Sequence, residues 1–126
     1  MNGAGFVAVG VGAAVGAWLR WWLSVSFNGL IANLPLGTLA ANLGGGFLVG
    51  MSYAFFSGMT SLAPEWRLLI VTGFLGGLTT FSTFSAESMV LMQKGQFVWA
   101  ALHSLVHLTG SILCCFLGFS VFRWMQ

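Results

Sequence analysis

Apolar residues fill four long segments of the chain, and short polar breaks separate these segments. The segments are Gly5–Ser26, Leu36–Ser57, Glu65–Gln93 and Phe97–Met125, and the breaks are Phe27–Pro35, Gly58–Pro64 and Lys94–Gln96. A helix needs about 20 apolar residues to cross a bilayer, so each segment is long enough to span one. Short connections make consecutive helices antiparallel neighbours. The pattern therefore predicts an all-α membrane protein, with residues 1–126 forming a single domain of four transmembrane helices.

Composition supports this class. The chain is 58% hydrophobic and 5% charged, whereas a soluble domain carries about 25% charged residues. No basic residue precedes the first apolar segment, which argues against a signal peptide. The net charge of +2 is too small to indicate binding to nucleic acid. Most of the chain is therefore expected to lie in lipid.

The four basic residues do not define an orientation. Four spans place Arg67 and Arg123 on one side of the membrane, and Arg20 and Lys94 on the other. An excess of Lys and Arg normally marks the cytoplasmic side, and here the count is equal. Either other features decide the topology, or copies insert in both directions and pair antiparallel.

Glycine pairs predict close helix contacts. Gly12/Gly16 and Gly46/Gly50 are GxxxG pairs, which let two helix backbones approach closely within one chain or between chains. Four short helices bury little surface between them, so an oligomer is expected.

The third segment contains the most informative stretch, Thr72–Glu87, which reads TGFLGGLTTFSTFSAE. We expect a helix from Glu65 to about Leu75, a break at Gly76-Gly77, and a second half-helix whose N-cap lies at Thr79-Thr80. A break frees carbonyls that can bind a cation and amides that favour an anion. The alternative is a glycine kink with hydroxyls bonded back to the i−4 carbonyls. The dense block of Phe81, Ser82, Thr83, Phe84 and Ser85 favours an ion site.

Polar rows follow single faces of three helices. Phe81 and Phe84 lie at i, i+3, where they could pack or turn their positive ring edges towards a small anion. Thr38/Asn42 and His103/His107/Ser111 lie at i, i+4 spacing on the second and fourth segments. Three such rows could line one narrow path.

Two charged side chains lie within or close to the apolar segments. Glu87 is an acid inside a span, which makes it a functional candidate, and the hydroxyl of Thr83 four residues earlier could satisfy it locally. Arg20 lies near a span end, where an arginine more often reaches towards the headgroups than contacts an ion.

His103 and His107 also have the spacing of metal ligands, with Cys114 on the same face. A zinc site needs three or four ligands, so two histidines are only half of one. Residues that hydrogen-bond in the interior are the simpler interpretation. Cys114 and Cys115 are adjacent on a helix and are expected to pack as small apolar residues.

Three blocks of this sequence are similar to the signature of the Fluc (CrcB) fluoride channels. They are GFLGGLTTFSTFSAE (Gly73–Glu87), GTLAANLGGGFLVG (Gly37–Gly50) and GAWLRWWLS (Gly16–Ser24). The resemblance covers nearly the whole chain. It implies a passive fluoride channel in a microbial plasma membrane, built as an antiparallel dual-topology homodimer with two pores at the subunit interface.

The resemblance also implies site residues. A structural Na⁺ at the broken helix would be bound by the backbone carbonyls of Gly76 and Thr79 from both subunits, and Arg20 matches an arginine at the end of the first helix. With the fourth-helix row included, the fluoride pathway maps to Thr38, Asn42, Phe81, Ser82, Thr83, Phe84, Glu87, His107 and Ser111.

One departure concerns the fourth helix, where the family pattern has Tyr or Ser in place of His103 and His107. If either histidine contacts the ion, conduction should change below about pH 6.5, the unperturbed pKa of histidine. Comparing fluoride flux against pH in the wild type and His107→Ala tests this, and identical profiles would exclude it.

Two alternatives remain at this point. A proton-coupled exporter of the small multidrug type has the same size, but it requires an acid in the first helix, and residues 1–26 contain none. An intramembrane enzyme could use His103, His107 and Ser104, but the sequence shows no carboxylate close by to orient the histidines.

Overall fold

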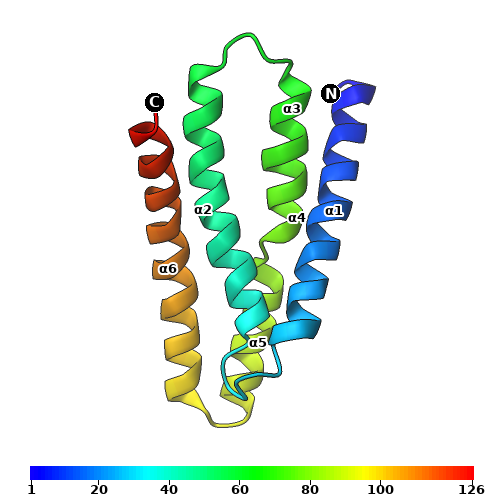
Figure 1. Ribbon diagram of the computed structural model, residues 1–126. Coiled ribbons are helices and arrows are strands. Elements are labelled where there is room, and N and C mark those ends of the chain that lie inside the picture. The colour runs from blue at the N-terminus through cyan, green and yellow to red at the C-terminus, as the bar shows by residue number, and fades with distance from the viewer.

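The computed structural model describes all residues, 1–126, as one bundle of helices without strands (Figure 1). The elements are α1 Gly3–Phe27, α2 Leu36–Gly58, α3 Pro64–Arg67, the π-helical η1 Leu68–Leu75, α4 Gly76–Leu78, α5 Phe81–Gln93 and α6 Phe97–Trp124. Four stretches are long and apolar enough to cross a membrane: Gly3–Phe27, Leu36–Gly58, Pro64–Gln93 and Phe97–Trp124. The predicted all-α class and the four spans are confirmed.

Local chemistry sets the ends of these helices. The Asn2 side chain accepts from the Gly5 amide at 2.8 Å and caps the start of α1. Between α5 and α6 the chain reverses at Gly95, whose φ of +72° is the only positive φ in the chain. Glycine adopts this conformation without strain, so the turn can be short.

Glycines allow two close helix contacts in the bundle. A Cβ at Gly12 or Gly16 of α1 would overlap the backbone of the third span, and a Cβ at Gly50 of α2 would overlap the carbonyl of Cys115 in α6. Figure 1 shows these pairs of helices side by side along their length. Both GxxxG pairs therefore pack within the chain.

The third span is broken, but not at the predicted residues. Gly76 is helical, with φ −65° and ψ −35°, and the interruption lies at Thr79 and Thr80, whose backbones are extended. The prediction of a break at Gly76-Gly77 is wrong because Gly77 serves packing instead. A Cβ there would overlap the backbone of Ala13 in α1. The predicted N-cap is confirmed at Thr80, whose hydroxyl accepts from the Thr83 amide at 3.0 Å.

The first half of this span also differs from expectation. Leu68–Leu75 is π-helical, a form that commonly accompanies functional positions. Nothing in its apolar sequence distinguishes it from an α-helix.

Candidate functional site at the broken helix

Asn42 of α2 holds the extended backbone of the break. Its Oδ1 accepts from the Thr80 amide at 2.7 Å, and its Nδ2 donates to the Thr80 carbonyl at 3.0 Å. Only a side-chain amide offers an acceptor and a donor side by side, so one residue replaces two helical hydrogen bonds. The same Nδ2 lies 3.0 Å from Nδ1 of His107 in α6. Asn42 therefore connects three spans at one point.

This arrangement changes the partners of the carbonyls before the break. In a regular helix the carbonyl of Gly76 would accept from the amide of Thr80, and that of Thr79 from Thr83. Here the Thr80 amide donates to Asn42 and the Thr83 amide donates to the Thr80 hydroxyl. The oxygens of Gly76 and Thr79 are thus released from helical bonding and can act as ligands for a hard cation.

Arg20 lies at the same break. Its Nε donates to the Gly77 carbonyl at 3.0 Å. The structure therefore gives Arg20 a partner in the third span that the sequence did not indicate. The contact gives a third carbonyl of the interrupted helix a charged partner.

A groove of about 580 Å³ runs beside the break. It is lined by Asn42, Gly46, Thr79, Thr80, Phe81, Phe84, Ser104, His107, Leu108, Ser111 and Ile112. The ring centroids of Phe81 and Phe84 are 5.3 Å apart, and Phe84 lies 5.0 Å from the ring of His107. Aromatic rings and hydrogen-bonding groups therefore meet in one groove that spans residues of α2, α5 and α6.

Five of the predicted pathway residues line this groove and four do not. The lining contains Asn42, Phe81, Phe84, His107 and Ser111. Thr38 is fully buried behind it, Ser82 is exposed, and Thr83 and Glu87 are partly buried. The three polar rows are thus divided between a groove and a separate buried network.

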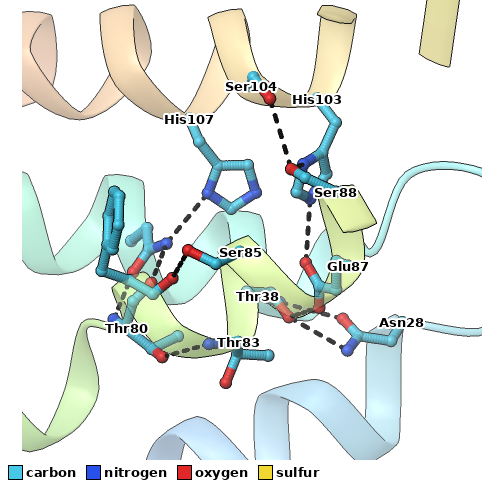
Figure 2. A network of polar contacts seen from close by, with 12 residues as sticks. Asn28, Thr38, Thr80, Thr83, Ser85, Glu87, Ser88, His103, Ser104 and His107 are labelled. Carbon is cyan, nitrogen blue, oxygen red and sulfur yellow. Dashed lines mark hydrogen bonds and ion pairs between the residues drawn. The ribbon is translucent and has the colours of Figure 1, made fainter. Parts of the chain in front are cut away.

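The buried network centres on Glu87 (Figure 2). The Thr38 hydroxyl donates to Glu87 Oε1 at 2.5 Å, and His103 Nε2 lies 2.9 Å from Oε2. His103 Nδ1 in turn contacts the Ser88 hydroxyl at 2.9 Å. The prediction that Thr83 satisfies Glu87 is wrong, because the carboxylate turns away from its own helix towards α2 and α6.

Two members of the network were missed from the sequence. Asn28, which follows α1, donates to the Thr38 hydroxyl at 3.2 Å and accepts from the Thr38 amide at 3.0 Å. Ser88 joins His103 to the Ser104 hydroxyl, which lies 3.3 Å away. Asn28 is part of an Asn-Gly pair, which in the sequence indicated only a loop. Ser88 follows Glu87 but does not belong to any of the polar rows at i, i+4 spacing.

The histidines have a carboxylate neighbour after all. Atoms of Glu87, His103 and His107 that could bind a metal lie within 4.8 Å of one another. The third side chain beside the two histidines is therefore Glu87, and not Cys114 as their spacing on one helix suggested. This corrects the premise that no carboxylate lies near the histidines. The hydrogen bonds nevertheless disfavour a metal, because Asn42 donates to His107 Nδ1 and leaves the proton on Nε2. His103 is itself 0% exposed.

These features define a class of protein. Four membrane-spanning stretches make the chain a multi-pass membrane protein, and a groove beside an interrupted membrane helix is a feature of ion channels and ion-coupled carriers. The chain belongs to the CrcB-like protein family, described as Camphor Resistance (CrcB), whose model matches residues 7–119.

Similar proteins carry a more specific name. The protein called fluoride-specific ion channel FluC in Cupriavidus pinatubonensis is 59% identical over 123 residues, covering 98% of each chain. The FluC proteins of Cupriavidus metallidurans and Pseudomonas putida are 58% and 53% identical, covering 98% and 95% of this chain. The two alignments cover 98% of the Cupriavidus metallidurans protein and 94% of the Pseudomonas putida protein.

Proposed function

We propose that this chain forms a passive fluoride-selective channel that exports toxic fluoride across the bacterial plasma membrane. The observation that carries the proposal is the groove in which Phe81, Phe84 and His107 meet, in a chain closely related to proteins named as fluoride channels. Fluoride enters cells as neutral HF and ionises inside. A passive anion path then lets it leave along the membrane potential without ATP.

The groove offers replacements for the ion's hydration shell. Stripping a small anion of water is very costly, so donors and positive ring edges must face it. Both N–H groups of Asn42 are already engaged, one with Thr80 and one with His107. We therefore assign Asn42 to holding the break and orienting His107, while the ring edges of Phe81 and Phe84 and the Ser111 side chain face the ion, with the His107 ring beside them.

A second copy of the chain is needed to close the site. Ser82 and Ser85 are exposed on α5, and the extended Thr79–Thr80 backbone interrupts a span. Irregular backbone within the hydrocarbon region occurs only where protein covers it or where it lines a cavity, and exposed hydroxyls are better accommodated against a partner than against lipid. Together with the balanced basic residues, this supports an antiparallel dual-topology homodimer with two pores at the subunit interface.

A structural Na⁺ fits the break. The carbonyls of Gly76 and Thr79 have lost their helical donors, and oxygen ligands of this kind suit a hard cation. The two residues from both subunits would hold the ion. When bound, it supplies a fixed positive charge in a medium of low dielectric constant.

Removing sodium should therefore weaken the dimer. Replacing Na⁺ in detergent solution by a large organic cation that cannot enter the site is expected to lower the thermal midpoint, because the carbonyls lose their partner. Restoring Na⁺ should restore the midpoint. Unfolding curves that coincide in the two salts would contradict sodium binding at Gly76 and Thr79.

The function is tested by anion efflux from liposomes that contain the purified protein. Fluoride efflux without a proton gradient, and much slower chloride efflux, is the expected result. Flux strictly tied to proton counter-movement would instead indicate a coupled exporter of the small multidrug type, which α1 disfavours because it contains no acid.

Phe81→Ile is expected to lower fluoride efflux about tenfold, because an aliphatic side chain removes the positive ring edge. A tenfold change corresponds to about 1.4 kcal/mol, which is the size of a favourable aromatic contact. Phe6→Ile is the matched control. Phe6 of α1 is 75% exposed, close to the 79% of Phe81, but it lies outside the groove. Efflux that is equal in the two variants would show that the Phe81 ring only packs.

A further inference from the structure

One of the two phenylalanines of the groove, Phe84, is stacked against a buried histidine. The ring centroids of Phe84 and His103 are 5.2 Å apart, and the planes of the two rings differ by 6°. Phe84 lines the groove, whereas His103 lies outside the lining and is fully buried. The imidazole therefore forms the wall behind Phe84 and presents no surface of its own to an ion in the groove.

Hydrogen bonds at both nitrogens fix the plane of the His103 ring. Nε2 lies 2.9 Å from Oε2 of Glu87, and Nδ1 lies 2.9 Å from the Ser88 hydroxyl. Figure 2 shows His103 of α6 turned towards these two residues of α5. A ring bonded at one nitrogen can still tilt about that bond, but bonds at two nitrogens in different directions leave a single orientation. His103 therefore offers Phe84 a flat surface that cannot turn.

The two partners of the imidazole are held in their turn. The Thr38 hydroxyl of α2 donates to the other carboxylate oxygen of Glu87 at 2.5 Å, and the Ser104 hydroxyl lies 3.3 Å from that of Ser88. Asn28, which follows α1, donates to the Thr38 hydroxyl at 3.2 Å. A chain of hydrogen bonds therefore runs from the end of α1 through α2 and α5 to α6, and the imidazole is the member of this chain that contacts a ring of the groove.

We propose that His103 is a positioning residue for the fluoride path, which sets the orientation of the Phe84 ring. The inference rests on the proposed fluoride channel and deepens it. An aromatic ring is positive at its edge and negative on its faces, so the edge attracts a small anion and the faces repel it. Stacking covers one face of Phe84, and rotation of this ring about its Cβ–Cγ bond would drive its edge into the fixed imidazole. Phe84 therefore keeps its edge available to the groove.

The same geometry gives Glu87 a role that requires no contact with the anion. A carboxylate inside the path would repel fluoride. Glu87 does not line the groove, and both of its oxygens are engaged, Oε1 with Thr38 and Oε2 with His103. Its role is then to hold the imidazole, so an acid within an anion channel acts on the path through the Phe84 ring.

Single-channel recording of the fluoride current through the reconstituted full-length protein tests this role. The current per channel measures throughput alone, whereas a loss of folding lowers only the number of channels. His103→Leu replaces the flat ring by a branched side chain and should lower the current about tenfold, the size expected for the loss of an aromatic contact. His103→Phe restores a flat face without the hydrogen bonds, so its current should lie between that of His103→Leu and that of the wild type.

A smaller change removes one of the two hydrogen bonds and keeps the ring. Ser88→Ala leaves Nδ1 of His103 without its partner, so the ring can tilt, and the current per channel should fall about threefold, as expected for one hydrogen bond. Ser57→Ala is the matched control, because the Ser57 hydroxyl bonds only to the Ala54 carbonyl of its own helix. Its current should equal that of the wild type.

The outcomes separate the positioning role from the channel itself. A wild-type current in His103→Leu, or an equal reduction in His103→Leu and His103→Phe, would overturn the positioning role and leave the channel standing. If His103→Leu forms no channels, Ser88→Ala decides, and an unchanged current in that variant would overturn the role. Absence of any fluoride current through the wild-type protein would overturn the channel.

Discussion

Asn42→Leu should reduce fluoride efflux to about one hundredth of the wild-type rate or less. Leucine has nearly the same size but leaves the Thr80 amide and carbonyl without their partner. Each unsatisfied buried polar group costs about 1–3 kcal/mol, and about 2.8 kcal/mol lowers the population of the ordered break 100-fold. The same change removes the contact that sets the proton position on His107. Efflux from liposomes at equal protein content measures the effect.

Asn33→Leu is the matched control for this variant. Asn33 lies in the connection between α1 and α2, away from the break, so its replacement should leave efflux close to that of the wild type. If the Asn42→Leu variant conducts fluoride as fast as the wild type, the assignment of Asn42 to the break is contradicted, because the break would then form without the Asn42 hydrogen bonds.

Gly50→Ala should prevent stable folding, although it adds a single methyl group. The new Cβ would overlap the Cys115 carbonyl and lie 2.8 Å from the Phe119 amide nitrogen, so α2 and α6 would have to separate. Backbone atoms cannot rotate away as a flexible side chain can. Overpacking of this kind costs about 3 kcal/mol, a large fraction of the stability of a small protein. Loss of a monodisperse peak in size-exclusion chromatography and a lower thermal midpoint are the expected results.

Gly44→Ala provides the same substitution on the same helix without the clash. A Cβ at Gly44 meets no atom of the protein within 4 Å, so alanine should be tolerated there and add up to about 1 kcal/mol of helix stability. Equal stability of the Gly50→Ala and wild-type proteins would show that α2 and α6 approach less closely than the structure indicates.

The broken third span shows which structural features the sequence pattern predicts and which it does not. The block from Thr72 to Glu87 predicted an interrupted helix with an N-cap, and Thr80 provides that cap. The position of the break was wrong because glycine has two uses in membrane helices, flexibility and close packing. Gly77 serves the second use, against Ala13. Sequence spacing does not distinguish the two, since the distinction depends on the neighbouring helix.

Glu87 shows the same limit for side chains. Its place inside an apolar span marked it as a functional candidate, and spacing along one helix suggested Thr83 as its partner. The actual partners, Thr38 and His103, come from two other helices. Periodicity describes which face of a helix a residue occupies, but not which helix lies opposite that face.

The sequence by itself determined that this chain spans a membrane four times, that its third span is interrupted and that it resembles fluoride channels. These conclusions depend on apolar length, local backbone preferences and contiguous motifs, which are properties of neighbouring residues. Only the tertiary structure decided that Asn42 binds the Thr80 backbone, that Arg20 binds the Gly77 carbonyl, and that Nε2 of His107 is buried without a hydrogen-bond partner. Hydrogen bonds between helices depend on rotation and depth in the bundle, which are set by packing of the whole chain.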